Sequence, residues 1–281
     1  METTKGQKEE TIDEQLVTRL RESSVCRNAC FDPSQLKRPR LKQRMKESWW
    51  DRATKNDGNE TKILDSWFER LWELHVSKGR AYHTAVHLDE MLSYFELLCG
   101  TEKPMSTSDK NIAEGERAII LSTFFHDAIY DGTSSTNEED SAQLFQEFAG
   151  AAGWTPSSPS ASLVQRVVDM ILATKKHTAS PSEDPFELLL FLDLDMSVLG
   201  KQPDAYRAYT ACIRTEYIHY PKEAYCQGRA SILASFLQQQ HIFATSLFRA
   251  AFETQARSNI EQEIAELKAG RIYGHEESSS N

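Results

Sequence analysis

From Thr61 onward, apolar residues recur at spacings of three and four, the period of one face of an α-helix. The first such series comprises Ile63, Trp67, Leu71 and Leu74. No segment shows the strict alternation of a half-buried strand, and no internal repeat is present. The pattern therefore predicts an all-α fold.

Further helices are predicted wherever later apolar series run between polar or glycine residues. Gly100 and Gly270 follow two of these series, as expected of residues just beyond a helix C-terminus. The predicted helices span residues 81–98, 114–130, 186–199, 205–217, 222–239 and 243–268.

The chain has 281 residues, a length near the upper limit for one hydrophobic core. Residues 1–60 are polar and mixed in charge, and we expect a partly disordered N-terminal extension there. The basic stretch at 37–46 could be a docking segment, but a solvated, loosely helical arm is the simpler interpretation. Residues 61–270 are predicted to form the folded domain, and residues 271–281 a disordered tail.

The charge balance argues against binding of nucleic acid through phosphate attraction. The chain has 42 acidic and 32 basic side chains, a net charge of -10 and a pI of about 5.4. Five scattered cysteines form neither a disulfide framework nor a paired zinc spacing, which favours a reducing compartment. No apolar run approaches the roughly 20 residues that span a bilayer, and the acidic start is unlike a signal peptide. We therefore predict a cytoplasmic protein with no membrane or nucleic-acid polymer as partner. The sequence gives no prediction of the oligomeric state.

Two apolar segments contain ionisable residues that a hydrophobic core does not favour. His126 and Asp127 end the apolar series of FFHDAIYD, and Asp193 and Asp195 interrupt the leucines of LDLDMSVLG. Buried carboxylates need partners, and a divalent metal ion would provide one. The alternative for the two aspartates is a helix cap and a buried ion pair, with Arg207 or Arg214 as partner.

A third segment, RAYHTAVHLDEML, places His83 and His87 four residues apart on one predicted helix face. Imidazole and carboxylate groups without thiolate suit a hydrolytic site for Zn, Mn, Fe, Co or Mg better than a structural zinc. We therefore expect a divalent metal as cofactor, with one or two ions.

The order of these segments, histidine, then His-Asp, then a late aspartate, resembles the HD superfamily of metalloenzymes. YHTAVH and DMSVL resemble segments of its cyclic-nucleotide phosphodiesterases. A wider resemblance, over roughly Ser66 to Leu267, is to a branch of predicted metal-dependent HD phosphohydrolases. Its pattern is carried here by GRAYHTAVHLDEML, FFHDAIYD, TNEEDSA, ILATKKH, FLDLDMSVLG, IRTEY, GRASIL and ARSNIEQEI.

The resemblance implies an HD-type helical bundle with the metal among its central helices. It implies His87, His126, Asp127 and Asp195 as metal ligands, with Asp193 as the alternative to Asp195. The sequence departs from the phosphodiesterases just after the His-Asp pair. Tyr130, Asp131 and Gly132 lie where those enzymes have a second histidine and a glycine before an asparagine. A cyclic-nucleotide substrate is therefore not implied.

His83 is implied to be the proton donor to the leaving oxygen, a task that suits an imidazole titrating near the working pH. The alternatives are a second ligand or a packing role. Asp131 and Glu138 are further candidate catalytic residues that would position water, although Glu138 also fits a helix N-terminus.

Arg80, Lys175 and His177 are the candidate substrate-binding residues, because arginine and lysine both bind phosphate. His177 could instead serve a second metal ion. For Arg214, Arg229 and Arg257 the simpler interpretation is pairing with carboxylates.

The function expected from these features is hydrolysis of a phosphomonoester, phosphodiester or pyrophosphate bond in a small molecule, with a nucleotide as one candidate. Two alternatives remain open. One is a di-iron HD-type oxygenase, which would need more histidine ligands. The other is a non-catalytic helical scaffold with a structural metal.

Overall fold

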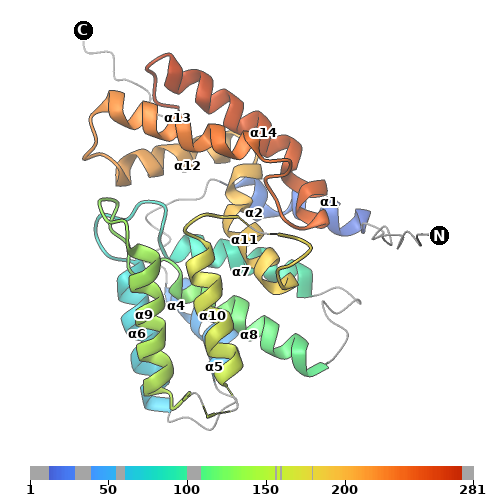
Figure 1. Ribbon diagram of the computed structural model, residues 1–281, viewed down its shortest axis with the longest axis vertical. Helices are drawn as coiled ribbons and strands as arrows, with labels where there is room; N and C mark the ends of the chain where they lie inside the picture. The colour runs from blue at the N-terminus through green and yellow to red at the C-terminus, as the bar shows by residue number, and fades with distance from the viewer. Residues whose placement is uncertain are drawn as a thin grey trace, which may run out of the picture.

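The computed structural model describes residues 13–28, 39–54, 61–99, 109–155, 157–158, 160–178 and 180–273. Every regular element in these ranges is a helix, and they contain no strand (Figure 1). The predicted all-α fold class is confirmed. No helix within these ranges combines the length and apolar character needed to cross a membrane.

Short helices occupy the first part of the chain and longer ones follow. The elements before residue 80 are α1 (Glu14–Glu22), α2 (Ser24–Arg27), α4 (Pro39–Arg44), the π-helical turn η1 (Met45–Trp50), α5 (Asp51–Thr54) and α6 (Thr61–His75). The later elements are α7 (Ala85–Cys99), α8 (Asp109–Phe125), α9 (Asn137–Ala151), α10 (Ala161–Ala173), α11 (Phe186–Met196), the 3-10 turn η3 (Ser197–Gly200), α12 (Pro203–Glu216), α13 (Lys222–Gln238) and α14 (Ser246–Lys268).

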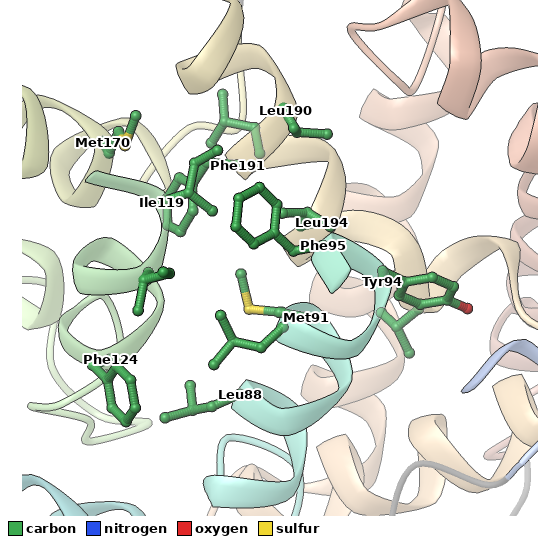
Figure 2. Packing of buried hydrophobic residues seen from close by; sticks show 14 of the residues in the cluster. Leu88, Met91, Tyr94, Phe95, Ile119, Phe124, Met170, Leu190, Phe191 and Leu194 are labelled. Carbon is green, nitrogen blue, oxygen red and sulfur yellow. The ribbon is translucent and has the colours of Figure 1, made fainter. Parts of the chain in front are cut away.

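Helix α7 lies between two groups of helices, with α5, α6, α8, α9 and α10 on one side and α12, α13 and α14 on the other (Figure 1). On one face, Leu88, Met91 and Phe95 pack toward side chains of α8 and α11 (Figure 2). On the opposite face, the Tyr94 ring lies 5.6 Å from that of Phe252 on α14. Both faces of α7 are therefore buried, which fixes the helix that carries His87.

The N-terminal helices belong to the hydrophobic core, contrary to the predicted polar extension over residues 1–60. Leu16, Val17 and Leu20 of α1 are buried, and Trp50 is fully buried. The Trp50 indole donates a hydrogen bond to the carbonyl oxygen of Leu64. Its neighbours are four aromatic rings, those of Phe68, Phe124, Phe125 and Phe148. The extension looked polar because its few apolar residues are separated by long charged stretches.

Charged side chains of the basic stretch pair within the protein. Lys42 and Lys46 each lie 2.5 Å from a carboxylate of α6, those of Glu69 and Asp65. Arg44 contacts Asp89 and Glu96 of α7. The described part of the stretch thus attaches α4 and η1 to α6 and α7. Residues 37 and 38 lie outside the described residues.

Residues 271–273, the first three of the predicted disordered tail, are described by the structure. Tyr273 is buried, and its hydroxyl donates a hydrogen bond to Gln262 Oε1. Residues 274–281 lie outside the described residues.

Trp50→Ala is expected to lower the free energy of unfolding by about 3–5 kcal/mol, because it empties a buried site among aromatic rings. Trp72→Ala is the matched control: Trp72 is only partly buried, and the expected loss is about 1 kcal/mol. Chemical denaturation followed by circular dichroism measures both values. Equal losses in the two variants would contradict the assignment of η1 to the core.

Candidate metal centre

The ionisable residues singled out in the sequence meet where several helices end. His87 lies in the first turn of α7, whereas His126 and Asp127 directly follow α8. Asp195 is the penultimate residue of α11, and His177 follows α10 in a left-handed backbone conformation with φ of 46°. Helix carboxyl ends carry partial negative charge. The ends of α8 and α11 therefore favour a cation at this point.

Three buried or half-buried side chains form the centre of this group. One ligand atom each from His87, His126 and Asp127 lie within 4.8 Å of one another, and the three can hold a metal ion. Asp195 borders the same atoms: its Oδ1 lies 3.1 Å from His87 Nε2 and 3.6 Å from His126 Nε2. The structure thus brings together all four residues that the resemblance implied as ligands.

His126 supplies the test of whether the group fits a cation. Its Nδ1 lies 3.0 Å from the carbonyl oxygen of Thr123, which can only accept, so Nδ1 carries the proton. Its Nε2 is buried and has no aligned hydrogen-bond partner, although Asp127 Oδ2 is 3.0 Å away. In a neutral His126, Nε2 therefore directs a lone pair toward carboxylates. A divalent cation at Nε2 would relieve this repulsion, so the residues fit the ion.

The charges of the group are strongly interdependent. Burial lowers the pKa of His126, but Asp127 and Asp195 outweigh it and raise that pKa well above its ordinary value. Burial raises the pKa of Asp127 and Asp195, yet the neighbouring histidines hold both below their usual range. His87 differs, since burial dominates and lowers its pKa. Both carboxylates are thus ionised near neutral pH, the state required of metal ligands.

The two aspartates of α11 have different surroundings. Asp193 accepts hydrogen bonds from the backbone N–H groups of Ala244 and Thr245 and from the Thr245 hydroxyl. It therefore anchors the turn before α14, and burial raises its pKa to about 7. Asp195 contacts only histidines among the contacts described for its carboxylate. The geometry favours Asp195 over Asp193 at the centre.

His177 lies at the edge of the same group. Its Nε2 is 2.8 Å from Asp195 Oδ2, the carboxylate oxygen that does not face His87. Asp195 thus lies between His87 and His126 on one side and His177 on the other. This position favours a role for His177 as a ligand of a second metal ion. It favours the predicted role in substrate binding less.

His83 is held in a separate arrangement by Glu216, the last residue of α12. Its Nδ1 lies 2.6 Å from Glu216 Oε2, and Glu216 Oε1 accepts from the backbone N–H groups of residues 81, 82 and 83. The Tyr130 hydroxyl also donates to Glu216 Oε2, and its ring stacks on His83 at 4.2 Å. Glu216 and Tyr130 were not predicted as site residues. Glu216 lies in IRTEY, a segment of the resemblance to which no role was assigned, and its contact with His83 spans 133 residues.

These contacts determine the charge of His83. Burial lowers its pKa, but the carboxylates of Glu216 and Asp127 outweigh burial and raise it above the ordinary value. The pKa of Glu216 is held at about 2, against the effect of burial, by His83 and the three backbone donors. The Glu216 carboxylate therefore favours the protonated form of His83, and the contact leaves Nε2 free.

Arg80 contacts the protein backbone. Its Nη1 donates to the carbonyl oxygens of His83 and Asp127 at 2.8 and 2.7 Å, and its Nη2 to that of Ala128 at 2.8 Å. These bonds occupy three of the five N–H donors of the guanidinium. The prediction that Arg80 binds substrate is not supported by these contacts.

Lys175 and Asp131 contact residues of the loop before α9 and of its first turn, which carries Glu138. Lys175 Nζ binds Glu139 Oε1 at 2.5 Å and the Ser135 carbonyl oxygen at 2.8 Å, with Glu138 at 4.0 Å. The exposed Asp131 carboxylate accepts from the backbone and hydroxyl of Thr133, bonds that lower its pKa. The structure thus ties these side chains to neighbouring loops. Their predicted roles in catalysis and substrate binding remain predictions.

Comparison with known proteins adds no family assignment: no protein-family model, no curated protein and no solved structure matches the chain.

Asp193→Asn and Asp195→Asn form a matched pair that separates the two aspartates. Asp195→Asn is expected to weaken metal binding at least about tenfold. Asp193→Asn is expected to retain metal but to lose about 1–3 kcal/mol of unfolding free energy, because one of its two acceptor oxygens becomes an NH2 group and the donors at that oxygen lose their acceptor. Elemental analysis after dialysis and chemical denaturation give the two readouts. Metal loss confined to Asp193→Asn would reverse the assignment.

Glu216→Gln is expected to lower the pKa of His83 in metal-free protein, measured by NMR titration of its ring protons. The stabilisation from protonated His83 should be complete below the unfolded pKa of about 6.5 and lost as pH rises through the higher folded pKa. Glu216 contributes its own share fully only above its unfolded pKa of about 4.5, so Glu216→Gln should cost most stability between about pH 4.5 and 6.5 and less above the folded pKa of His83. Tyr130→Phe, which keeps the Glu216 charge, is the control. An unchanged His83 pKa in Glu216→Gln would contradict the ion pair.

Proposed function

We propose that the protein is a metal-dependent phosphohydrolase of the HD superfamily, acting on an ester or anhydride bond in a small phosphorylated molecule. The proposed ligands of the divalent ion are His87, His126, Asp127 and Asp195. The proposed proton donor is His83. The chemistry of the donor set suits Zn, Mn, Fe, Co or Mg.

One juxtaposition carries the proposal. The group of His87, His126, Asp127 and Asp195 lies beside His83, whose protonated form is favoured by the Glu216 carboxylate. The ring centres of His83 and His87 are 6.2 Å apart, so His83 is close to the group yet bound elsewhere. A hydrolase needs this pair of functions, one for the attacking water and one for the leaving oxygen. A purely structural metal site does not require a partly exposed, titratable histidine such as His83 beside it.

When bound, a divalent ion supplies Lewis acidity, polarising a phosphoryl oxygen and lowering the pKa of a coordinated water. The residues of the chain provide the remaining steps. Glu216 fixes the Nδ1–H of His83 and stabilises its positive charge, which leaves the Nε2 proton for the leaving oxygen as the P–O bond breaks. Tyr130 stacks on the imidazole and limits its rotation.

One observation favours a second candidate, the di-iron oxygenase. His177 contacts Asp195 and so adds a third imidazole near that carboxylate. A site with His87, His126 and His177 around Asp195 has the fuller histidine set that such an enzyme would need. Redox-active iron in the purified protein, without hydrolysis of any phosphorylated compound, would decide for this candidate.

His83→Asn is expected to lower hydrolysis by about 10²- to 10⁴-fold while metal content stays at the wild-type level, because it removes the proton donor and no ligand. Asp127→Ala is expected to lose both metal and activity. His241→Asn, at an exposed position, is the control. The assay is a screen of phosphorylated compounds with protein loaded with Mn, Co, Mg or Zn, together with elemental analysis.

Two results would contradict the proposal. Failure of the wild type to bind any of these metals would remove the proposed site. Full activity in His83→Asn would remove the proposed proton donor.

A further inference from the structure

Arg80 connects the two segments that carry the site. It follows Gly79, whose φ of +96° is one that few other residues adopt, in the turn between α6 and α7. Both N–H groups of Nη1 are used, one on the carbonyl oxygen of His83 and one on that of Asp127. A single nitrogen atom therefore links the backbone of the proposed proton donor to that of a proposed metal ligand.

Two further contacts of Arg80 extend this link. Nη2 donates to the carbonyl oxygen of Ala128, so that two consecutive peptide groups after α8 are bound by one guanidinium. The guanidinium carbon also lies 5.4 Å from the centre of the Tyr130 ring, and that ring stacks on His83. Arg80 thus contacts the backbone of His83 directly and its imidazole through Tyr130.

The acceptors need these bonds. The carbonyl groups of residues 127 and 128 follow the C-terminus of α8 and lie outside the hydrogen-bond pattern of that helix. The turn at residues 81–84 precedes α7 and is likewise irregular. Arg80 therefore connects two irregular segments, residues 81–84 and residues 127–128. Its hydrogen bond to Asp127 spans 47 residues of the chain, and without Arg80 the two segments would lose this direct connection. A planar fork with several donors can bind three carbonyl groups at once, whereas a lysine ammonium cannot reproduce that geometry.

We propose that Arg80 is a positioning residue, which sets the placement of His83 relative to Asp127 by binding their backbone carbonyl groups. This inference rests on the proposed function for its effect on turnover, but its effect on metal binding is independent of the reaction. It replaces the expectation that Arg80 binds the phosphate of the substrate.

The test compares Arg80→Lys and Arg80→Gln with wild type by titration of the metal-free protein with Mn²⁺. Arg80→Lys keeps the positive charge and loses the fork. Positioning predicts that both variants bind Mn²⁺ about 10- to 100-fold more weakly, as is typical when groups that orient ligands are removed. Arg257→Lys is the matched control, because Arg257 also binds three backbone carbonyl groups, those of Leu237 in the last turn of α13 and of Gln239 and Gln240 after it.

Steady-state kinetics on a phosphorylated compound found in the screen gives the second readout. Positioning predicts a fall in kcat for Arg80→Lys similar to that for Arg80→Gln, with KM changed much less. A phosphate-binding role predicts the opposite: Arg80→Lys close to wild type and a rise in KM for Arg80→Gln. If Arg80→Gln does not fold, as judged by circular dichroism, Arg80→Lys alone decides.

The outcomes separate this inference from the proposed function. Wild-type affinity for Mn²⁺ in Arg80→Lys would overturn the positioning role, whether or not the protein hydrolyses phosphate compounds. Weakened Mn²⁺ binding in Arg80→Lys with wild-type binding in Arg257→Lys would support it. The same result in a protein without any hydrolytic activity would leave the positioning role standing and overturn the phosphohydrolase.

Discussion

The balance of charge among His87, His126, Asp127 and Asp195 is the constraint on which the structure around α7 depends. Two carboxylates removed from water are costly unless positive charge or donors surround them. The carboxyl ends of α8 and α11 add to the negative potential at the same point. The apolar side chains of α7, α8 and α11 hold these helix ends together (Figure 2). Core packing thus brings two carboxylates and two helix carboxyl ends close together. The resulting negative charge requires protonated histidines or a metal ion to balance it.

Side chains from distant segments hold the turns that carry this group. Burial lowers the pKa of His75 to about 3, so it is neutral, and its Nε2–H donates to the carbonyl oxygen of Phe124. Glu216 binds three consecutive backbone N–H groups before α7, and Asp193 binds two before α14. Each residue satisfies backbone groups at or next to a helix end that have no partner within the helix. The turns are therefore fixed although they lack regular secondary structure.

The N-terminal helices contact the segment that leads into the candidate metal centre. Trp50 packs on Phe124 and Phe125, the two residues that immediately precede His126. Loosening of η1 would therefore reach the segment that carries His126 and Asp127 through direct contacts. Trp49, the other fully buried tryptophan of η1, packs on Phe95 of α7.

The sequence by itself determined the all-α class, because helical periodicity is local. Burial logic, together with the resemblance, pointed to His87, His126 and Asp127, because a His-Asp pair within an apolar helix needs a partner. The sequence left Asp193 and Asp195 open, since both interrupt the same leucine series and only the packing of α14 separates them. It did not indicate Glu216, and it assigned Arg80 to substrate. The partners of these residues lie up to 135 positions away, so only the tertiary structure decided their contacts. The same holds for residues 13–28 and 39–54, whose burial depends on surfaces supplied by later helices.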